Sequence, residues 1–515
     1  MKNCLRNLRV LLCATLIALC GVPAFAQYLR TSYFMDGVHF RQQMNPALNP
    51  ERGYINFPVV GSINGSVTSN SFGYQDVLDI VDNSSNSDYF MSKDFMDKLN
   101  DKNKLNFNLA TDILGAGWYK GKNFWNFNLG FRFDMGAVVP KSVFQFMQHM
   151  NGEFDNLDKW NGHQFAIGQE ELHVQTYLEA GVGFSRQVNE KLNVGGRAKV
   201  LLGVGNVDLN IKKMDINMDI QNGKGQYVGM TTDWGKIADG GLEGLQEAIN
   251  QGIVEVDPTD PYNMNKAKVV MHGQASIDAD AELQASFKGL EFETNQQLND
   301  NGEIVEIVED VDFDKPGLSG WGLGIDLGAS YKLTKNLTVS ASVLDLGFVK
   351  WNGKHTQCAK TGFAQVYNFD SNTTVDELMH FAEDVSSGEI INFDVLNMQK
   401  VKGKDRTTAL QAKMVFGAEY SLFNEWLVIG ALSTTHFTRP KALTEFTVSA
   451  NIRPSNAFNF ALSYSLIQSR GKSFGLAAKL GPVFIGTDYM FFGKENTKCL
   501  NAYLGLSIPL NKRKG

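Results

Sequence analysis

Long stretches in which apolar and polar residues alternate constrain the fold of this chain more than any other feature. From 124 to 135 every second residue is apolar, and the residues between them are polar or glycine. The same pattern recurs at 322–333 and 500–510. A period of two places the apolar side chains on one face of a β-strand and the polar side chains on the other. The sequence therefore predicts long, two-faced strands.

The length of these stretches favours strands that cross a membrane. Strands of soluble proteins usually have about 5–6 residues, whereas a transmembrane strand needs about 9–11. Most of the fourteen predicted strands reach the longer range. They cover 54–68, 105–119, 123–138, 171–187, 192–210, 319–333, 337–351, 407–421, 425–438, 442–453, 457–470, 473–480, 482–492 and 499–510.

The connections between the predicted strands sort by length onto two sides. Counting up and down from the first strand places six short turns together on the periplasmic side, and all the long connections on the other side. The long connections are 69–104, 139–170, 211–318 and 352–406. Short periplasmic turns and long extracellular loops are typical of outer-membrane barrels. We therefore predict an all-β fold, a transmembrane antiparallel up-and-down β-barrel of 14 strands with long extracellular loops.

The connection 211–318 leaves an alternative of 16 strands, in which one hairpin inside it also spans the membrane. Its alternation is interrupted by Lys, Asp and Gln, so we favour long strands that rise above the membrane. Short helices are predicted in the loops at 90–100, 141–150, 241–252 and 374–385.

The first 26 residues have the three parts of a secretory signal peptide. A basic start and an apolar stretch at 10–20 precede the small-residue cleavage site 24–26, Ala-Phe-Ala. This predicts export to the cell outer membrane with cleavage near Ala26. A lipoprotein signal through Cys20 is the weaker alternative, because the residue before it is not small. We divide the rest into an N-terminal segment, 27–53, and the barrel with its inserts, 54–515.

Charge and cysteine content exclude some functions. The chain has a formal net charge of −7, and cleavage of the basic signal makes it more acidic. No nucleic-acid partner is expected, because such a partner needs a basic surface. Only Cys358 and Cys499 remain after cleavage. They either pair or stay free; both interpretations are open.

Two segments resemble known barrel families. Residues 44–50, Met-Asn-Pro-Ala-Leu-Asn-Pro, resemble the N-terminal signature of outer-membrane barrels related to the fatty-acid transporter FadL and the type IX secretion protein PorV. Residues 342–351, Ser-Val-Leu-Asp-Leu-Gly-Phe-Val-Lys-Trp, are similar to an uncharacterised Bacteroidota outer-membrane β-barrel family, a domain of unknown function. The resemblance implies a barrel whose N-terminal segment enters the lumen.

A plug in the lumen is physically reasonable because the Asn-Pro steps of this segment cannot continue a strand or a helix. An exposed leader is the alternative. A lumen of 14 strands is wide enough to be filled or to conduct, so we favour the plug. The predicted plug residues are Asn45, Pro46, Ala47, Asn49 and Pro50.

Charged residues on the polar faces of the strands predict the lining of the lumen. We assign Arg132, Asp134, Asp326 and Lys332 to it, because ionisable groups at membrane depth face water or one another. Arg132 with Asp134 and Asp326 with Lys332 are candidate ion pairs. We expect such pairs to hold the barrel and plug together rather than to contact a solute.

No motif predicts an enzyme, a cofactor or a metal site. The chain has no Gly-x-Ser-x-Gly elbow and no phosphate-binding loop, and its eight histidines lack the spacing of metal ligands. The acidic runs at 278–282 and 310–314 resemble calcium ligands only in part, because neither has glycine at the sixth loop position. We interpret them as solvated faces of the extracellular rim.

Two functions follow from this architecture and from the resemblance. The first is a FadL-like passive transporter or channel for small hydrophobic or amphipathic solutes. The second is a non-conducting surface scaffold or a secretion-associated barrel. The expected partners are outer-membrane lipid and lipopolysaccharide, the barrel-assembly machinery, and either a small hydrophobic solute or a secretion partner.

Overall fold

The structure is a computed structural model that describes residues 29–512. It leaves out, within this range, 57–60, 84–88, 91, 151–160, 163, 228–240, 257, 260–267, 300–301, 316, 363, 370–395, 456, 468–472 and 491–497. The predicted signal peptide and the predicted helix at 374–385 therefore lie outside the described residues. No helix in the described part of the chain is long and apolar enough to cross a membrane.

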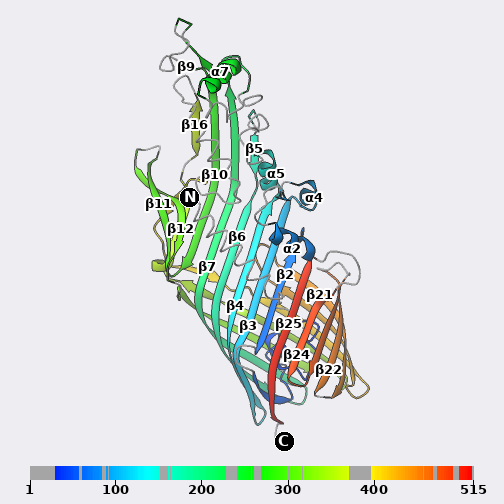
Figure 1. The fold of residues 1–515 in the computed structure, drawn as a ribbon. Helices are drawn as coiled ribbons and strands as arrows, with labels where there is room; N and C mark the ends of the chain where they lie inside the picture. The colour runs from blue at the N-terminus through cyan, green and yellow to red at the C-terminus, as the bar shows by residue number, and fades with distance from the viewer. Residues whose placement is uncertain are drawn as a thin grey trace.

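The strands form a closed antiparallel barrel with fourteen strand positions, which confirms the predicted fold class (Figure 1). β1 (Arg52–Asn56) and β2 (Ser62–Ser69) share the first position, and both pair with β25 (Cys499–Lys512) on one side and β3 (Lys102–Lys120) on the other. Between β3 and β25 lie β4 (Asn123–Pro140), β6 (Glu170–Gln187), β7 (Leu192–Gln221), β13 (Gly320–Lys332), β14 (Leu337–Trp351), β19 (Lys413–Leu422), β20 (Leu427–His436), β21 (Leu443–Ser455), β22 (Phe458–Ser465), β23 (Ser473–Leu480) and β24 (Val483–Met490). The alternative of 16 strands is wrong.

Each barrel strand has an apolar outer face and a more polar inner face, as β4 illustrates. Trp125 and Phe127 on its outer face are 37% and 39% exposed, whereas Asn126 between them is 2% exposed and faces inward. Exposed Leu, Ile and Phe side chains continue around β13, β20, β22 and β24. A closed barrel leaves no unpaired strand edge, and an apolar outer surface suits lipid. The molecule is therefore built as an outer-membrane type of barrel.

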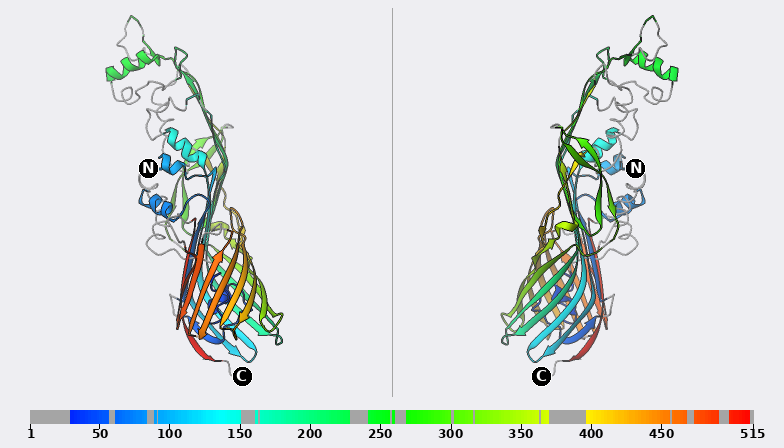
Figure 2. Two further views of the ribbon diagram at one scale, coloured as in Figure 1. Left: turned by 90° about the vertical axis from the view of Figure 1, so that its right-hand side faces the viewer. Right: turned by 90° about the vertical axis from the view of Figure 1, so that its left-hand side faces the viewer.

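All the long connections leave the same end of the barrel, and three of them, 139–170, 211–318 and 352–406, add strands that extend the barrel's sheet above it; this extension is named here the upper sheet (Figures 1 and 2). The strand β7 is 30 residues long: its first part pairs with β13 in the barrel, and its second part, from Gly205 onward, pairs with β10 (His272–Phe287) above it. The rest of this sheet comprises β5 (Gln164–Ile167), β11 (Leu290–Leu298), β12 (Ile304–Phe313), β15 (Thr356–Thr361), β16 (Gln365–Phe369) and β17 (Met398–Val401). The strand β18 (Arg406–Ala409) instead pairs with the end of β14, in line with β19. The region 211–318 thus forms strands that rise above the barrel, as predicted.

Short helices lie in the loops of this upper region. They are α2 (Tyr74–Asp82), α4 (Lys93–Met96), α5 (Lys141–Met150), α7 (Gly241–Gln251) and η4 (Gly353–His355), with the small ladder of β8 (Val254–Glu255) and β9 (Lys268–Val269) beside α7. Three of the predicted helices correspond to α4, α5 and α7, whereas α2 was not predicted. Ser92 caps α4, because its side chain accepts a hydrogen bond from the Phe95 N–H.

The two mature cysteines do not pair. Cys358 lies on β15 in the upper sheet and Cys499 begins β25 in the barrel wall, and both thiols are buried and outside any disulfide. The choice left open by the sequence is therefore settled against a disulfide between them. The upper sheet has its own apolar core, which includes Leu209, Leu283 and Met398.

Candidate functional site

Residues 29–50, named here the luminal segment, lie inside the barrel (Figure 2). The Thr31 Oγ1 is 2.6 Å from the Ser463 Oγ on β22, and the Tyr33 hydroxyl is 2.9 Å from the Ser340 Oγ on β14. On the opposite side, the Gln43 amide donates to Asp112 on β3 at 2.5 Å. Only a segment within the lumen can reach strands on all sides of a barrel.

The five residues predicted to form a plug all contact the barrel wall or fold the segment against it. The Asn45 amide donates to the carbonyls of Ala329 and Ala341, both at 3.3 Å, while its Oδ1 accepts the Ala47 N–H at 2.9 Å. The carbonyl of Ala47 accepts a hydrogen bond from Asn193, and the Asn49 Oδ1 accepts one from Ser185. The Pro50 carbonyl accepts the Tyr119 hydroxyl at 2.6 Å, and Pro46 lies against Gly195.

Inward-facing glycines make room for the luminal segment. A Cβ added to Gly430 on β20 would lie 2.2 Å from the Phe34 ring, and one added to Gly328 on β13 would lie 2.1 Å from the Asn45 Oδ1. No side chain at these two positions could coexist with the segment in its present place. Gly328 belongs to the alternating stretch 322–333, in which the glycines share one face with the polar residues.

One side of the lumen, named here the apolar wall, supplies most of the apolar contacts to the luminal segment, although Glu445 and Asp488 are also buried there. Inward side chains of β14, β19, β20 and β22–β25 pack on the luminal segment in a single buried cluster. From the segment it contains Leu29, Tyr33, Phe34, Met35, Val38, Phe40, Met44 and Leu48, and from the wall Leu344, Val415, Val428, Leu432, Ala461, Ala477, Phe484 and Tyr503. This apolar wall is not typical of a water-filled pore, whose interior is polar. The segment covers it.

The opposite wall carries buried charges. Arg132 on β4 bonds Asp112 on β3 at 3.1 Å and Glu179 on β6 at 3.3 Å. Lys199 on β7 bonds Asp326 on β13 at 2.9 Å and Asp345 on β14 at 2.5 Å, and Lys413 on β19 bonds Asp345 at 2.9 Å. This charged wall runs continuously from β3 to β19, from one strand to the next.

A β-bulge positions Asp345 at the centre of these charges. The register between β13 and β14 shifts beside Asp326, and Asp345 has a φ of 56°. Aspartate tolerates this left-handed conformation better than most residues, and a bulge re-aims the side chain that it carries. The Asp345 N–H donates to the Asp326 carboxylate at 2.8 Å, while its own carboxylate is shared between two lysines.

Three of the four predicted lumen residues are buried in this wall, but their partners differ from the prediction. Asp134 accepts a hydrogen bond from the Asn108 amide at 2.6 Å, whereas Arg132 bonds other carboxylates. Asp326 bonds Lys199. Lys332 is exposed at the end of β13, about 20 Å along the strand from Asp326. Neighbouring strands are about 4.8 Å apart, whereas residues two apart on one strand are separated by about 6.6 Å. Ion pairs therefore form across strands.

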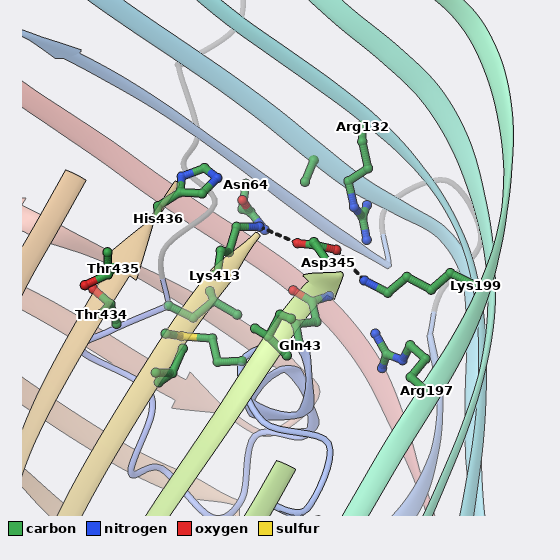
Figure 3. A pocket seen from close by; sticks show the side chains of 15 residues that line it. Gln43, Asn64, Arg132, Arg197, Lys199, Asp345, Lys413, Thr434, Thr435 and His436 are labelled. Atoms are coloured by element: carbon green, nitrogen blue, oxygen red, sulfur yellow. Dashed lines mark hydrogen bonds and ion pairs between the residues drawn. The ribbon is translucent and has the colours of Figure 1, made fainter. Parts of the chain in front are cut away.

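A cavity of about 50 Å³ separates the charged wall from the luminal segment (Figure 3). Its lining includes Arg132, Arg197, Lys199, Asp345 and Lys413 from the wall. The segment contributes three further lining residues, Leu29, Gln43 and Met44. Two waters or a small ion would fit, since one water needs about 10–15 Å³ on this measure.

A second apolar layer lies above the charges, toward the end with the long loops. It consists of Tyr177, Leu201, Val349, Trp351 and Leu410. Trp351 is completely buried, and its indole N–H donates to the Thr408 hydroxyl at 2.8 Å. The lumen therefore holds the luminal segment beside the charged wall, with the cavity between them, and this apolar layer above the charges.

Several buried polar atoms at the contact between the segment and the wall lack a hydrogen bond within the described residues. They include the His39 Nε2 and the Gln42 Oε1 on the segment, and the Asn193 Oδ1 and the Arg197 Nε on the wall. A buried polar group without a partner costs about 1–3 kcal/mol. The contact is therefore less stable than a fully satisfied core of the same size.

The sequence analysis did not identify Asp112, Glu179, Arg197, Lys199, Asp345 and Lys413 as members of this site. Their common signal was available, because each is an ionisable residue within a predicted spanning strand. Asp345 also lies in the stretch 342–351 that carries the family resemblance. Among the described residues, no group of three or more His, Cys, Asp or Glu side chains could hold a metal ion.

Comparison with solved structures found similar barrels. The chain has 10% identity to the TodX deltaS2S3 mutant monoaromatic hydrocarbon channel over 90% of this chain and 91% of that one, with a TM-score of 0.35. It has 9% identity to the Ralstonia pickettii toluene transporter TbuX, covering 95% and 96%, with a TM-score of 0.29. For the translocator domain of the autotransporter NalP from Neisseria meningitidis, the values are 8% identity, 94% and 98% coverage and a TM-score of 0.30. The closed barrel itself follows from the strand pairing of this chain, not from these likenesses.

Comparison at the level of families gives a clearer result. A search of curated proteins found no match. In contrast, residues 46–488 match a family of unknown function, DUF5723, and this range includes most of the barrel, the charged wall and the end of the luminal segment. The predicted resemblance to a barrel family of unknown function is thus confirmed, and the chain belongs to the DUF5723 family.

Proposed function

We propose that this protein is a passive transporter of the outer membrane for small amphipathic solutes, and that the luminal segment closes it. In this proposal the short-turn end faces the periplasm and the sheet built by β7 and β10 faces the outside. The signal peptide of residues 1–26 would direct export.

The observation that carries the proposal is the difference between the two walls of the lumen. A mainly apolar wall on β19–β25, which also buries Glu445 and Asp488, faces the charged wall that runs from β3 to β19. With the luminal segment displaced, the lumen would offer apolar surface on one side and hydrogen-bonding groups on the other. A solute with an apolar body and a polar end matches both walls at once.

Transport requires the segment to move, because the lumen is too full in the present state. The cavity has about 50 Å³, whereas a cavity that holds benzene has about 150 Å³. The unpaired polar atoms at the contact between segment and wall favour such movement, since water would satisfy them once the segment leaves.

A reversible tether tests the proposal. The hydroxyls of Thr31 and Ser463 are 2.6 Å apart, so the double variant Thr31→Cys/Ser463→Cys is placed to form a disulfide between segment and wall. In proteoliposomes, the oxidised double variant should take up no amphipathic dye, and the reduced protein should take it up at the wild-type rate. The matched controls are the two single-cysteine variants, which oxidation should leave unchanged. Equal uptake before and after reduction of the disulfide would refute the proposal that the luminal segment closes the transporter.

A second candidate function, a non-conducting surface scaffold, is favoured by the size of the upper sheet. Its apolar core includes Ile211, Phe292 and Val308, independent of the barrel lumen. A sheet with its own core can present a rigid surface outside the cell. The absence of uptake by wild-type protein and by both states of the tethered variant would support the scaffold and exclude the transporter.

A further inference from the structure

Arg197 is a buried cation with acids near it but without a direct ion pair. It lies on β7, is 6% exposed, and is opposite Asp326 on β13 in the strand pairing. Within the described residues, no hydrogen bond or ion pair reaches its guanidinium group, and the buried Nε has no acceptor. Buried donors without acceptors are costly in a protein interior. Such a residue points to a ligand.

The guanidinium group faces the cavity shown in Figure 3. Three further cations line the same cavity, namely Arg132, Lys199 and Lys413, but only one carboxylate does so, that of Asp345. Both Asp345 oxygens are already bonded, Oδ1 to Lys199 at 2.5 Å and Oδ2 to Lys413 at 2.9 Å.

The other carboxylates of the wall are also engaged outside the cavity lining. Glu179 bonds Arg132 at 3.3 Å and lies 3.7 Å from Lys199. Asp326 bonds Lys199 at 2.9 Å and accepts the Asp345 N–H. These acids balance the cluster as a whole, but they leave the donors of Arg197 pointing at the empty side of the cavity.

We infer that the cavity binds a small anionic group through Arg197. A guanidinium group presents five N–H donors in a fixed fork, which suits an anion better than a single ammonium does. The volume of about 50 Å³ admits chloride, nitrate or a single anionic head group, but not a larger organic anion in full. The inference does not require transport, because the cavity exists while the luminal segment is in place.

Chloride binding to the purified full-length protein in detergent tests the inference. The probe is the excess line width of the chloride nuclear magnetic resonance signal during a titration, with gluconate holding the ionic strength constant. Wild-type protein should show saturable broadening. Arg197→Gln should weaken the affinity at least about tenfold, since a hydrogen bond to a charged group is worth about 1.5–3 kcal/mol.

Two further variants keep the test decisive. Arg197→Lys retains the charge but loses the fork, so an intermediate affinity is expected even if the Gln variant folds poorly. Lys212→Gln removes an exposed cation of the upper sheet that is bonded to Asp280 at 3.0 Å, and it should bind chloride as the wild type does. Unsaturable broadening, or equal affinity of the wild type and both Arg197 variants, would overturn the inference.

A competition experiment distinguishes the two sources of the anion, the head group of an amphipathic solute and a free inorganic anion. Butanesulfonate carries a small anionic head on an apolar chain that exceeds the closed cavity. Displacement of chloride by butanesulfonate only in the reduced form of the Thr31→Cys/Ser463→Cys variant would identify the head of an amphipathic solute as the natural ligand. Failure to displace chloride in either form would identify a free inorganic anion.

Discussion

The two walls of the lumen are both buried inside the barrel, but different interactions stabilise them. The wall from β3 to β19 pairs its charges across neighbouring strands, as Arg132 does with Asp112 and Glu179. The wall from β19 to β25 is mainly apolar, although Asp488 pairs there with Arg30 of the luminal segment, and it becomes buried only because that segment covers it. The charged wall is therefore stable by itself, whereas the apolar wall depends on a part of the chain that is not a strand.

This difference assigns separate roles to the two walls: the ion pairs of the charged wall stabilise the barrel, and the apolar wall keeps the luminal segment docked in the lumen. Removing a charge that pairs with others in the first wall should destabilise the barrel. Removing an apolar contact from the second wall should release the luminal segment and leave the barrel intact. The following variants are designed to break this distinction, from the largest expected effect to the smallest.

The largest effect is expected from Lys199→Met. Lys199 is the shared partner of Asp326 and Asp345 and is 6% exposed. Its loss leaves the buried Asp326 carboxylate without its ion-pair partner and Asp345 with Lys413 alone, and breaking a buried pair costs about 3–5 kcal/mol. Urea unfolding of the barrel in detergent should show this loss in the free energy of unfolding. An unchanged unfolding midpoint would mean that the charged wall does not hold the barrel.

A smaller and more local effect is expected from Phe34→Ala. The Phe34 side chain is 2% exposed and packs against the apolar wall. Truncation of a buried Phe costs about 3 kcal/mol or more, and here the cost should fall on docking of the segment. Amide hydrogen exchange at 33–35 should accelerate about a hundredfold, while the barrel strands keep their protection. Phe423→Ala, at a position 74% exposed, is the matched control.

Acid should also loosen the luminal segment. Burial, with a smaller contribution from the charge of Lys479, lowers the pKa of His39 to about 3, against the opposing effect of a hydrogen bond with Asn56. His39 also stacks on Tyr54 with ring centroids 3.8 Å apart. In the undocked segment the pKa returns to about 6.5, so the undocked state binds more protons between pH 6.5 and 3.

Docking should therefore weaken as the pH falls below 6.5, by about 2 kcal/mol at pH 5. Limited proteolysis of the segment at pH 7.5 and pH 5 measures this change. His39→Gln should remove the difference between the two pH values. A difference of the same size in that variant would assign the effect to another group.

The smallest effect is expected from Lys212→Gln. Lys212 and Asp280 form an ion pair between β7 and β10, above the barrel, with both side chains at least half exposed. Exposed pairs contribute little because water and salt screen them. Neither the unfolding midpoint nor the protection of the luminal segment should change. A large loss of stability would show that charge pairs in this protein act alike inside and outside the lumen.

The strands could be predicted from the sequence because their period of two and their length depend on local composition alone. The stretch 124–135 predicts β4 within a few residues, and the interrupted pattern after residue 211 correctly predicts strands outside the membrane. The Asn-Pro steps at 45–46 and 49–50 indicate a segment that cannot continue a strand or a helix, but they do not encode its contacts with the wall.

The partners of the charged residues could not be predicted, because they depend on the register between strands. Asp326 is opposite the bulge at Asp345 and beside Lys199 only once β7, β13 and β14 are aligned. No local pattern encodes that alignment. The lack of a hydrogen-bond acceptor at Arg197 could not be predicted either, because it depends on the shape of the cavity between the barrel wall and the luminal segment.

The most direct test of the central claim is the conductance of a single Thr31→Cys/Ser463→Cys barrel in a planar bilayer, recorded before and after addition of a reductant. We predict a silent barrel while the disulfide holds the luminal segment, and opening events that appear on reduction. A barrel that conducts equally in both states would contradict the claim that residues 29–50 close the lumen, and one that stays silent in both would contradict the claim that they can leave it.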